Sequence, residues 1–264
     1  MQKCGLCFHC VLCLSQKGMV ISMKELTALQ MTEFWESYNE IENIMGKITN
    51  LVILRKFDHI MDTFWCKKAP DPSLGFNNGL YRGYEAISGY IAAIKERDAV
   101  SAKTAQKLHP VELGSFTAGE LAGVGGVDVL SFTTPVIEIA GDGGTAKGIW
   151  YLMGGSADFY TEKGPYAANH WGRAAVDFVR EDGIWKIWHM LFAIDIDSPM
   201  GGSWAHNECT PEAPEYAEIA AVSLPEPNVS GALYETYHPR RPNGAFPRIP
   251  ERYGTFTETF SYGA

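Results

Sequence analysis

The chain has 264 residues, of which 46% are apolar and 12% aromatic, and its formal net charge is -9 at pH 7. This length and composition suffice for one domain with a sizeable core, extended by arms. The negative charge and the lack of a Lys/Arg-rich run argue against a nucleic-acid partner, and no apolar run is long enough to span a membrane. We therefore expect a soluble, cytoplasmic protein that binds neither nucleic acid nor a membrane.

Residues 1–22 form a cysteine-rich leader. Its four cysteines recur at every third position and are Cys4, Cys7, Cys10 and Cys13. The spacing is near that of iron–sulfur ligands, but the fourth cysteine comes one residue early. Zinc ligands normally come in pairs from two separated loops. An iron–sulfur cluster, a zinc ion and a leader without metal are all compatible with the spacing, and we predict a disordered leader that holds no metal.

Two overlapping helical patterns follow the leader. Apolar residues recur at helical spacing over residues 23–45, and the same spacing continues from Ile41 to Trp65. The second pattern is predicted to bend near Gly46 or near Arg55. A further helix is predicted at Tyr84–Arg97, after a turn and a short extended link. The first half of the chain is therefore expected to be mainly helical.

Residues 99–130 interrupt the pattern, because five glycines break any long element there. We predict an inserted segment that forms a lid or contacts a partner. After it, β-forming residues dominate and predict an antiparallel meander. Its strands are expected at Phe132–Ala140, Thr145–Met153, Ala174–Arg180 and Ile184–Ile196. Helices first and an antiparallel sheet second is an α+β pattern.

Residues 198–264 have a different composition. Nine prolines argue against a compact second domain, yet nine aromatic residues are too many for a solvated tail. We predict a long extended C-terminal arm, laid over the domain or over a second subunit, which buries its rings without a core of its own.

A β-hairpin is predicted between Trp171 and His189, where two β-forming runs flank residues 181–183. A three-residue turn followed by a bulge places Asp177 opposite Ile187 and diagonal to His189, close enough for the carboxylate to orient the imidazole. Strand alternation places His189 in an apolar row, together with Trp185, Ile187 and Leu191. The pair of Asp177 and His189 is the candidate for chemistry. The alternative is a structural histidine held by a buried carboxylate.

The order of these segments resembles that of SnoaL-like proteins of the nuclear transport factor 2-like superfamily. The resemblance covers about residues 41–197 and depends on the motifs Tyr81–Ile87, Thr134–Asp142, Thr145–Trp150 and Val176–His189. It implies an α+β cone, in which a strongly curved antiparallel sheet wraps around a long helix and leaves a deep apolar pocket open at one end. We predict a domain at residues 23–197, with an N-terminal helical extension, that forms a homodimer or a higher homo-oligomer.

Two positions depart from this family. Its enzymes often carry a Tyr, His or Asp in the middle of the first cone helix, where this chain offers Asn50 as the polar candidate. They often carry a His just before the strand that begins near Thr134, where the nearest substitutes are Asp128 and His109. An acid–base pair from that side of the pocket is therefore replaced in this chain.

We predict that His189 acts as general acid or base, that Asp177 orients it, and that Tyr81 or Asn50 hydrogen-bonds the oxygen on which charge develops. Further contacts with the substrate are predicted from Asn50, His59, Trp150, Arg173, Trp185 and His109.

The predicted function is that of a cofactor-independent lyase, dehydratase or isomerase. Because the resemblance implies an apolar pocket, the expected substrate is a hydrophobic aromatic or polycyclic oxygenated small molecule. No cofactor is expected. The alternative is a non-catalytic small-molecule-binding or dimer scaffold protein with the same cone.

Overall fold

A computed structural model describes residues 27–159, 165–202, 223–238, 240, 244 and 246–263. The predicted leader, residues 1–22, lies outside the described residues. The helices are α1 (Ala28–Ile53), α2 (Phe57–Phe64), α3 (Tyr84–Leu108) and α4 (Pro110–Leu113), with a short 3-10 helix η3 (Phe256–Glu258). The strands are β1 (Ser73–Phe76), β2 (Gly79–Arg82), β3 (Gly126–Ile139), β4 (Thr145–Asp158), β5 (Tyr166–Glu181), β6 (Ile184–Pro199) and β7 (Val229–Ser230).

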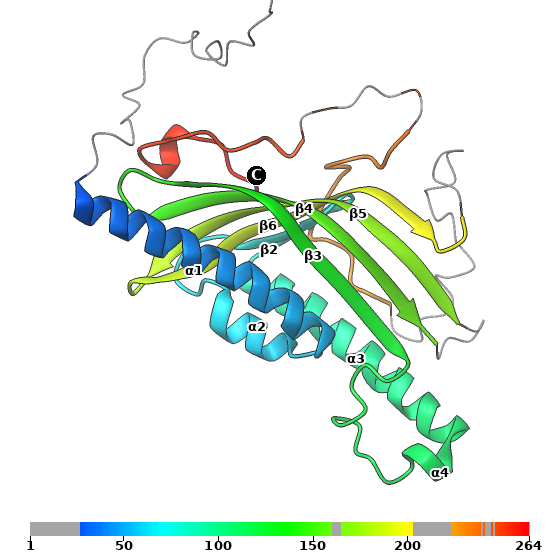
Figure 1. Ribbon diagram of the computed structural model, residues 1–264. Coiled ribbons are helices and arrows are strands. Elements are labelled where there is room, and N and C mark those ends of the chain that lie inside the picture. Colours follow the sequence, from blue (N-terminus) through cyan, green and yellow to red (C-terminus); the bar gives the residue numbers. More distant parts are fainter. Residues whose placement is uncertain are drawn as a thin grey trace, which may run out of the picture.

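The strands of the described residues form one curved sheet in the order β3-β4-β5-β6-β1-β2-β7. All neighbouring strands are antiparallel except β1 and β6, which are parallel. Figure 1 shows the helices α1, α2 and α3 along one face of the sheet, called here the inner face, and the C-terminal segment across the other, the outer face. The predicted α+β class and the curved antiparallel sheet are confirmed.

The helical layer breaks at Arg55. The helix α1 is capped by Thr27 and ends at Ile53. Arg55 then takes a left-handed conformation with φ of 55° before α2 resumes the helical path. The bend predicted near Arg55 is therefore confirmed, whereas α1 runs through Gly46.

None of the helices in the described part of the chain has the length and apolarity to cross a membrane.

The main core lies between the helical layer and the inner face. The side chains of Ile41 and Met45 on α1 pack against the sheet residues Trp150, Phe178 and Trp185, which are all at most 2% exposed. Burying such large side chains contributes about 1.5–3 kcal/mol each to folding. The long amphipathic helix is thus held by packing rather than by its intrinsic propensity.

The central strands are longer than predicted. The strand β3 begins at Gly126 and β5 begins at Tyr166, so the sheet extends into segments that the sequence assigns to the insertion and to a loop. The helix α3 likewise continues to Leu108 rather than ending at Arg97. Pairing with neighbouring strands overrides the weak local β-propensity of these segments.

The hairpin between β5 and β6 has a tighter turn than predicted. Asp182 and Gly183 both have positive φ, 52° and 81°, and Glu181 pairs directly with Ile184. These features define a two-residue type I′ turn, so the predicted three-residue turn is wrong. The bulge lies further along β6, where Trp188 is the extra residue between the pairs Phe178–Ile187 and Asp177–His189.

Gly183→Ala should lower the free energy of unfolding by about 1–2 kcal/mol, because a side chain destabilises the left-handed conformation. The matched control is Gly89→Ala in α3, where a glycine costs a helix about 0.5–1 kcal/mol relative to alanine. A methyl group meets no atom within 4 Å at either position, so the backbone alone decides the sign. Urea unfolding should show opposite changes for the two variants, and equal changes would contradict this account.

Candidate functional site

The structure brings the predicted pair of Asp177 and His189 together. The two residues face each other in register on β5 and β6. Their exposed fractions are 0% and 6%, and Nδ1 of His189 lies 2.9 Å from Oδ2 of Asp177. The contact arises from the bulge at Trp188, which places the two side chains directly opposite rather than diagonal.

A buried lysine and the C-terminal segment complete this cluster. Lys147, the register partner of Asp177 on β4, places Nζ 2.5 Å from Oδ1 of the carboxylate. The backbone N–H of Tyr262 and the hydroxyl of Ser261 donate to Oδ2 over 2.8 Å and 3.0 Å. We call these residues, Lys147, Asp177, His189, Ser261 and Tyr262, the outer-face cluster.

The outer-face cluster lies on the side of the sheet away from the helices. Trp185 and Ile187 pack in the core with the helices, whereas Leu191 packs with Tyr262 of the C-terminal segment. The prediction that His189 shares a face with Trp185 and Ile187 is therefore wrong, because the extra residue at the bulge reverses the alternation. The catalytic role of this pair stays a prediction, and its position beneath the C-terminal segment separates it from the inner face.

Three predicted site residues belong to the packed core. The hydroxyl of Tyr81 donates to the carbonyl of Pro225 over 2.6 Å, and Nε1 of Trp150 donates to Glu42 over 2.8 Å. Trp185 is 1% exposed. Since Tyr81 is engaged with the C-terminal arm, its hydroxyl is not presented to a ligand in this structure.

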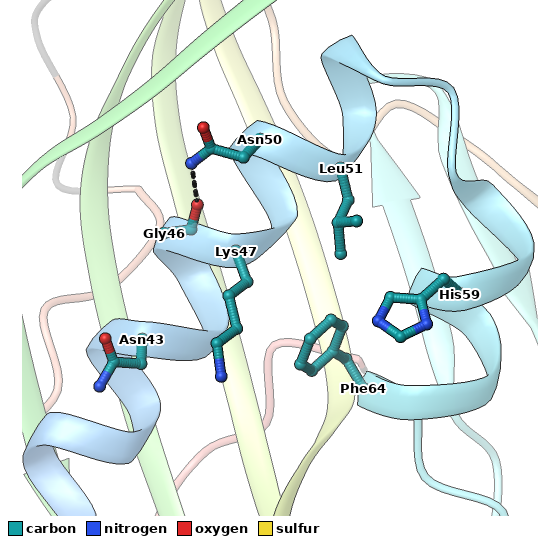
Figure 2. A pocket seen from close by; sticks show the side chains of 7 residues that line it. All are labelled: Asn43, Gly46, Lys47, Asn50, Leu51, His59 and Phe64. Carbon is teal, nitrogen blue, oxygen red and sulfur yellow. Dashed lines mark hydrogen bonds between the residues drawn. The ribbon is translucent and has the colours of Figure 1, made fainter.

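The other predicted contacts are dispersed. Asn50 and His59 meet at an open hollow of about 470 Å³ between α1 and α2, on the outer surface of the helical layer (Figure 2). Arg173 lies on the outer face, where it donates to the hydroxyl of Tyr234 over 3.0 Å, and His109 lies between α3 and α4. Figure 2 shows the amide of Asn50 bonded back to the carbonyl of Gly46 on its own helix. The lining residues of the hollow are Asn43, Gly46, Lys47, Asn50, Leu51, His59 and Phe64.

A different set of polar residues lies on the inner face. Asp128 on β3 pairs with Ser156 on β4, and His170 on β5 pairs with Asp197 on β6. Ser156 and His170 are diagonal neighbours, with 2.8 Å between Oγ and Nε2, while Nδ1 of His170 lies 2.9 Å from Oδ1 of Asp197. Directly paired residues share a face, so four adjacent strands form one line of side chains, which we call the polar row.

The helical layer contacts this polar row through Arg55. Its guanidinium bonds the carboxylate of Asp128, and Nε lies 3.8 Å from a carboxylate oxygen of Asp98 on α3. Gly123 and Gly126 lie against the same arginine, so a side chain at either would meet it. The left-handed turn at Arg55 thus directs a cation onto the inner face at the point where β3 begins.

The polar row is partly exposed to solvent, and its charges shift the pKa of His170. The side chains of His170 and Asp197 are 30% and 34% exposed, so both are accessible to solvent. The hydrogen bond to Asp197 raises the pKa of His170 above its ordinary value, and the negative charges of Asp197 and Asp128 add to the shift while burial opposes it. The imidazole therefore keeps its proton to higher pH than a free histidine and is suited to proton transfer near neutral pH.

Asp197→Asn should lower the pKa of His170, measured from its imidazole resonances by NMR between pH 5 and 9. Because the folded pKa lies above the unfolded one, this pair stabilises the fold below the unfolded pKa, and its contribution is lost as pH rises through the folded pKa. The variant should lose that pH dependence. Asp182→Asn, a change at the hairpin turn, is the control that should leave the titration unchanged, and an unaltered His170 in the Asp197 variant would contradict the assignment.

Aromatic side chains lie beside the polar row. Phe192 on β6 stacks against Phe132 on β3 and Phe76 on β1, with ring centroids 6.4 Å and 5.7 Å apart. The rings of Tyr81 and Tyr90 are 4.6 Å apart. Tyr81 is buried in the core, whereas the other four rings are half-buried and pack against it, so they present flat apolar surface next to the polar groups.

Among these aromatic residues, Tyr90 has a hydroxyl whose pKa responds to a charge in the polar row. Burial raises the pKa of Tyr90 to about 12, and the charges of Tyr81 and Asp128 add to the shift while that of Arg97 opposes it. The phenol is therefore protonated at neutral pH and is available as a hydrogen-bond donor.

From the sequence, Asp128 is a substitute for a family histidine, and His170 is placed in a loop from which it could reach the rim of the pocket. Ser156, Asp197 and Arg55 are not identified from the sequence as site residues. Pairing across four strands brings the residues of the polar row together. That pairing depends on strand lengths that local propensity does not predict.

Comparisons with known proteins identify one family model and several solved structures that are similar to this chain. The family model of the SnoaL-like domain matches residues 36–191. Among solved structures, the hexachlorocyclohexane dehydrochlorinase LinA-type3 from Novosphingobium barchaimii is 13% identical over 66% of this chain and 96% of its own, with a TM-score of 0.44. A proposed scytalone dehydratase from Novosphingobium aromaticivorans is 11% identical over 69% and 97%, with a TM-score of 0.45.

A third solved structure, the protein Rv3472 from Mycobacterium tuberculosis, is 15% identical over 63% of this chain and 76% of its own, with a TM-score of 0.42. A search of curated protein sequences gives no significant match. The family model alone spans more than half of the 264 residues. The chain therefore belongs to the SnoaL-like domain family.

Proposed function

We propose that this protein is a cofactor-independent lyase, dehydratase or isomerase whose proton-transfer group is His170 on the inner face. The observation that carries the proposal is the hydrogen-bonded line of Ser156, His170 and Asp197, half-open beside an aromatic surface. Membership of the SnoaL-like domain family is consistent with it.

Each group in the polar row has a role in this proposal. Asp197 fixes the ring of His170 through Nδ1, which leaves Nε2 to exchange a proton with a substrate bound in place of the contact to Ser156. Arg55 or the hydroxyl of Tyr90 stabilises the oxygen on which negative charge develops. Removal of a proton next to a carbonyl or phenol then leads to loss of water or an aldehyde, or to double-bond isomerisation.

The proposed substrate is a hydrophobic, aromatic or polycyclic molecule that carries oxygen. Rings of this kind match the flat surfaces of Phe132, Phe192 and Tyr90. The polar row then contacts the oxygenated edge of the ligand. The homodimer and the cytoplasmic location stay predictions.

The test is a turnover and binding screen of the full chain with phenolic and polycyclic ketone or alcohol compounds, without added cofactor. Wild-type protein should convert at least one compound, and His170→Ala should bind it without converting it. Equal turnover by the variant would contradict the role of His170. Binding without turnover by the wild type would favour the alternative of a non-catalytic binding protein.

A further inference from the structure

The outer-face cluster contains an amine and a carboxyl group held against each other without access to water. Lys147 and Asp177 are direct register partners on β4 and β5, and both are 0% exposed. Their Nζ and Oδ1 atoms are 2.5 Å apart, within hydrogen-bond distance. The two strands therefore hold the reactants of an amide bond in contact.

The two oxygens of the Asp177 carboxyl group have different surroundings. Oδ2 receives three donors, which are Nδ1 of His189 at 2.9 Å, the hydroxyl of Ser261 at 3.0 Å and the backbone N–H of Tyr262 at 2.8 Å. Oδ1 faces Lys147. Fixed donors of this kind stabilise negative charge that develops on an oxygen when a nucleophile adds to the carbon.

The surroundings of the Lys147 amine are mostly aromatic. Within the described residues, Asp177 is the polar partner of Nζ. The amine also lies over the rings of Phe256, Phe260, Tyr262 and Tyr253, with centroids 4.5, 4.7, 5.2 and 5.9 Å away. An ammonium has three protons to share, and one acceptor satisfies one of them. Burial lowers the pKa of Lys147, although the charge of Asp177 opposes this shift, and desolvated lysines of this kind act as nucleophiles.

We propose that Lys147 and Asp177 condense to an intramolecular isopeptide bond that joins β4 to β5. Nζ adds to the side-chain carboxyl carbon of Asp177, and the tetrahedral oxygen Oδ2 is held by the three donors. Two protons of the ammonium leave with Oδ1 as water, and the third stays on the amide nitrogen. No oxidant, metal or second substrate enters the reaction, so atoms and charges balance between the ion pair and the amide plus water.

His189 is the proton carrier of this step. Its Nδ1 lies within hydrogen-bond distance of both Oδ2 of Asp177 and the hydroxyl of Ser261. It donates to Oδ2 as charge develops there and recovers the proton when the carbonyl re-forms, so the net proton change is zero. The C-terminal segment supplies two of the three donors and the aromatic rings over Lys147, and it therefore completes the reaction centre.

The test is the intact mass of the purified, denatured full chain, followed by proteolysis and peptide mapping. The proposal predicts a chain lighter than its sequence by one water molecule, and a branched peptide that joins the segments containing Lys147 and Asp177. A chain of unmodified mass, or one that lacks water without the branched peptide, would overturn the proposal and leave a buried ion pair.

Two substitutions sharpen the result. Lys147→Arg should have the full mass calculated from its own sequence, because the guanidinium is a far poorer nucleophile and stays protonated. The matched control is Lys186→Arg, at a lysine on β6 that donates to the carbonyl of Thr63, and it should keep both the mass deficit and the branched peptide. Persistence of the deficit in the Lys147 variant would also overturn the proposal.

Discussion

Replacing Asp177 with alanine should lower the free energy of unfolding by about 3–5 kcal/mol, because it leaves a buried lysine without its counter-charge. Lys147 and Asp177 are both fully buried. His189, Ser261 and the N–H of Tyr262 lose the same acceptor, and unsatisfied buried donors add to the cost. The expected effect is large whether the two side chains are joined ionically or covalently.

Urea unfolding of wild-type and variant protein measures this loss. The double variant Lys147→Met/Asp177→Leu should recover part of it, since removing both charges leaves no unpaired ion in the core. The matched control is Asp62→Ala, which breaks an exposed pair with Lys67 and should change stability little. A loss in Asp177→Ala as small as that in Asp62→Ala would contradict the assigned role of the cluster.

The hairpin illustrates how far the sequence predicts this structure. Gly183 and the β-forming runs on either side identify the turn from the sequence, and alternation identifies Asp177 and His189 as neighbours. The structure confirms the positive φ at Gly183 and the contact between the two side chains. The bulge at Trp188 has no local sequence signal. It changes which face His189 occupies, and therefore whether it belongs with the helices or with the C-terminal segment.

The polar row could not be predicted for a related reason. Ser156 follows two glycines in a segment that the sequence does not assign to a strand, and Asp197 lies at the end of a strand that was expected to stop at Ile196. Sheet pairing extends both strands and brings their side chains to His170. Such contacts between distant residues depend on register, and one residue of slip would turn each side chain to the other face.

His170→Ala should lower kcat on any converted substrate by about 10²–10⁴-fold, the range typical of a general acid or base. KM should change less, because the aromatic rings of Phe132, Phe192 and Tyr90 supply most of the proposed ligand contact. A parallel rise in KM with unchanged kcat would assign His170 to binding rather than to proton transfer. The matched control is His238→Ala, in the C-terminal arm, which should leave both constants unchanged.

Asp197→Asn tests whether Asp197 acts through His170 as a positioning residue. The hydrogen bond that His170 donates to Asp197 is the main cause of the raised pKa of His170, so its loss should move the His170 limb of the kcat–pH profile to lower pH. The direction is the same for a base, whose rate rises through this pKa, and for an acid, whose rate falls through it. A merely structural role would reduce the amount of active protein without moving the limb, so an unshifted profile with lower amplitude would remove Asp197 from the proposed machinery.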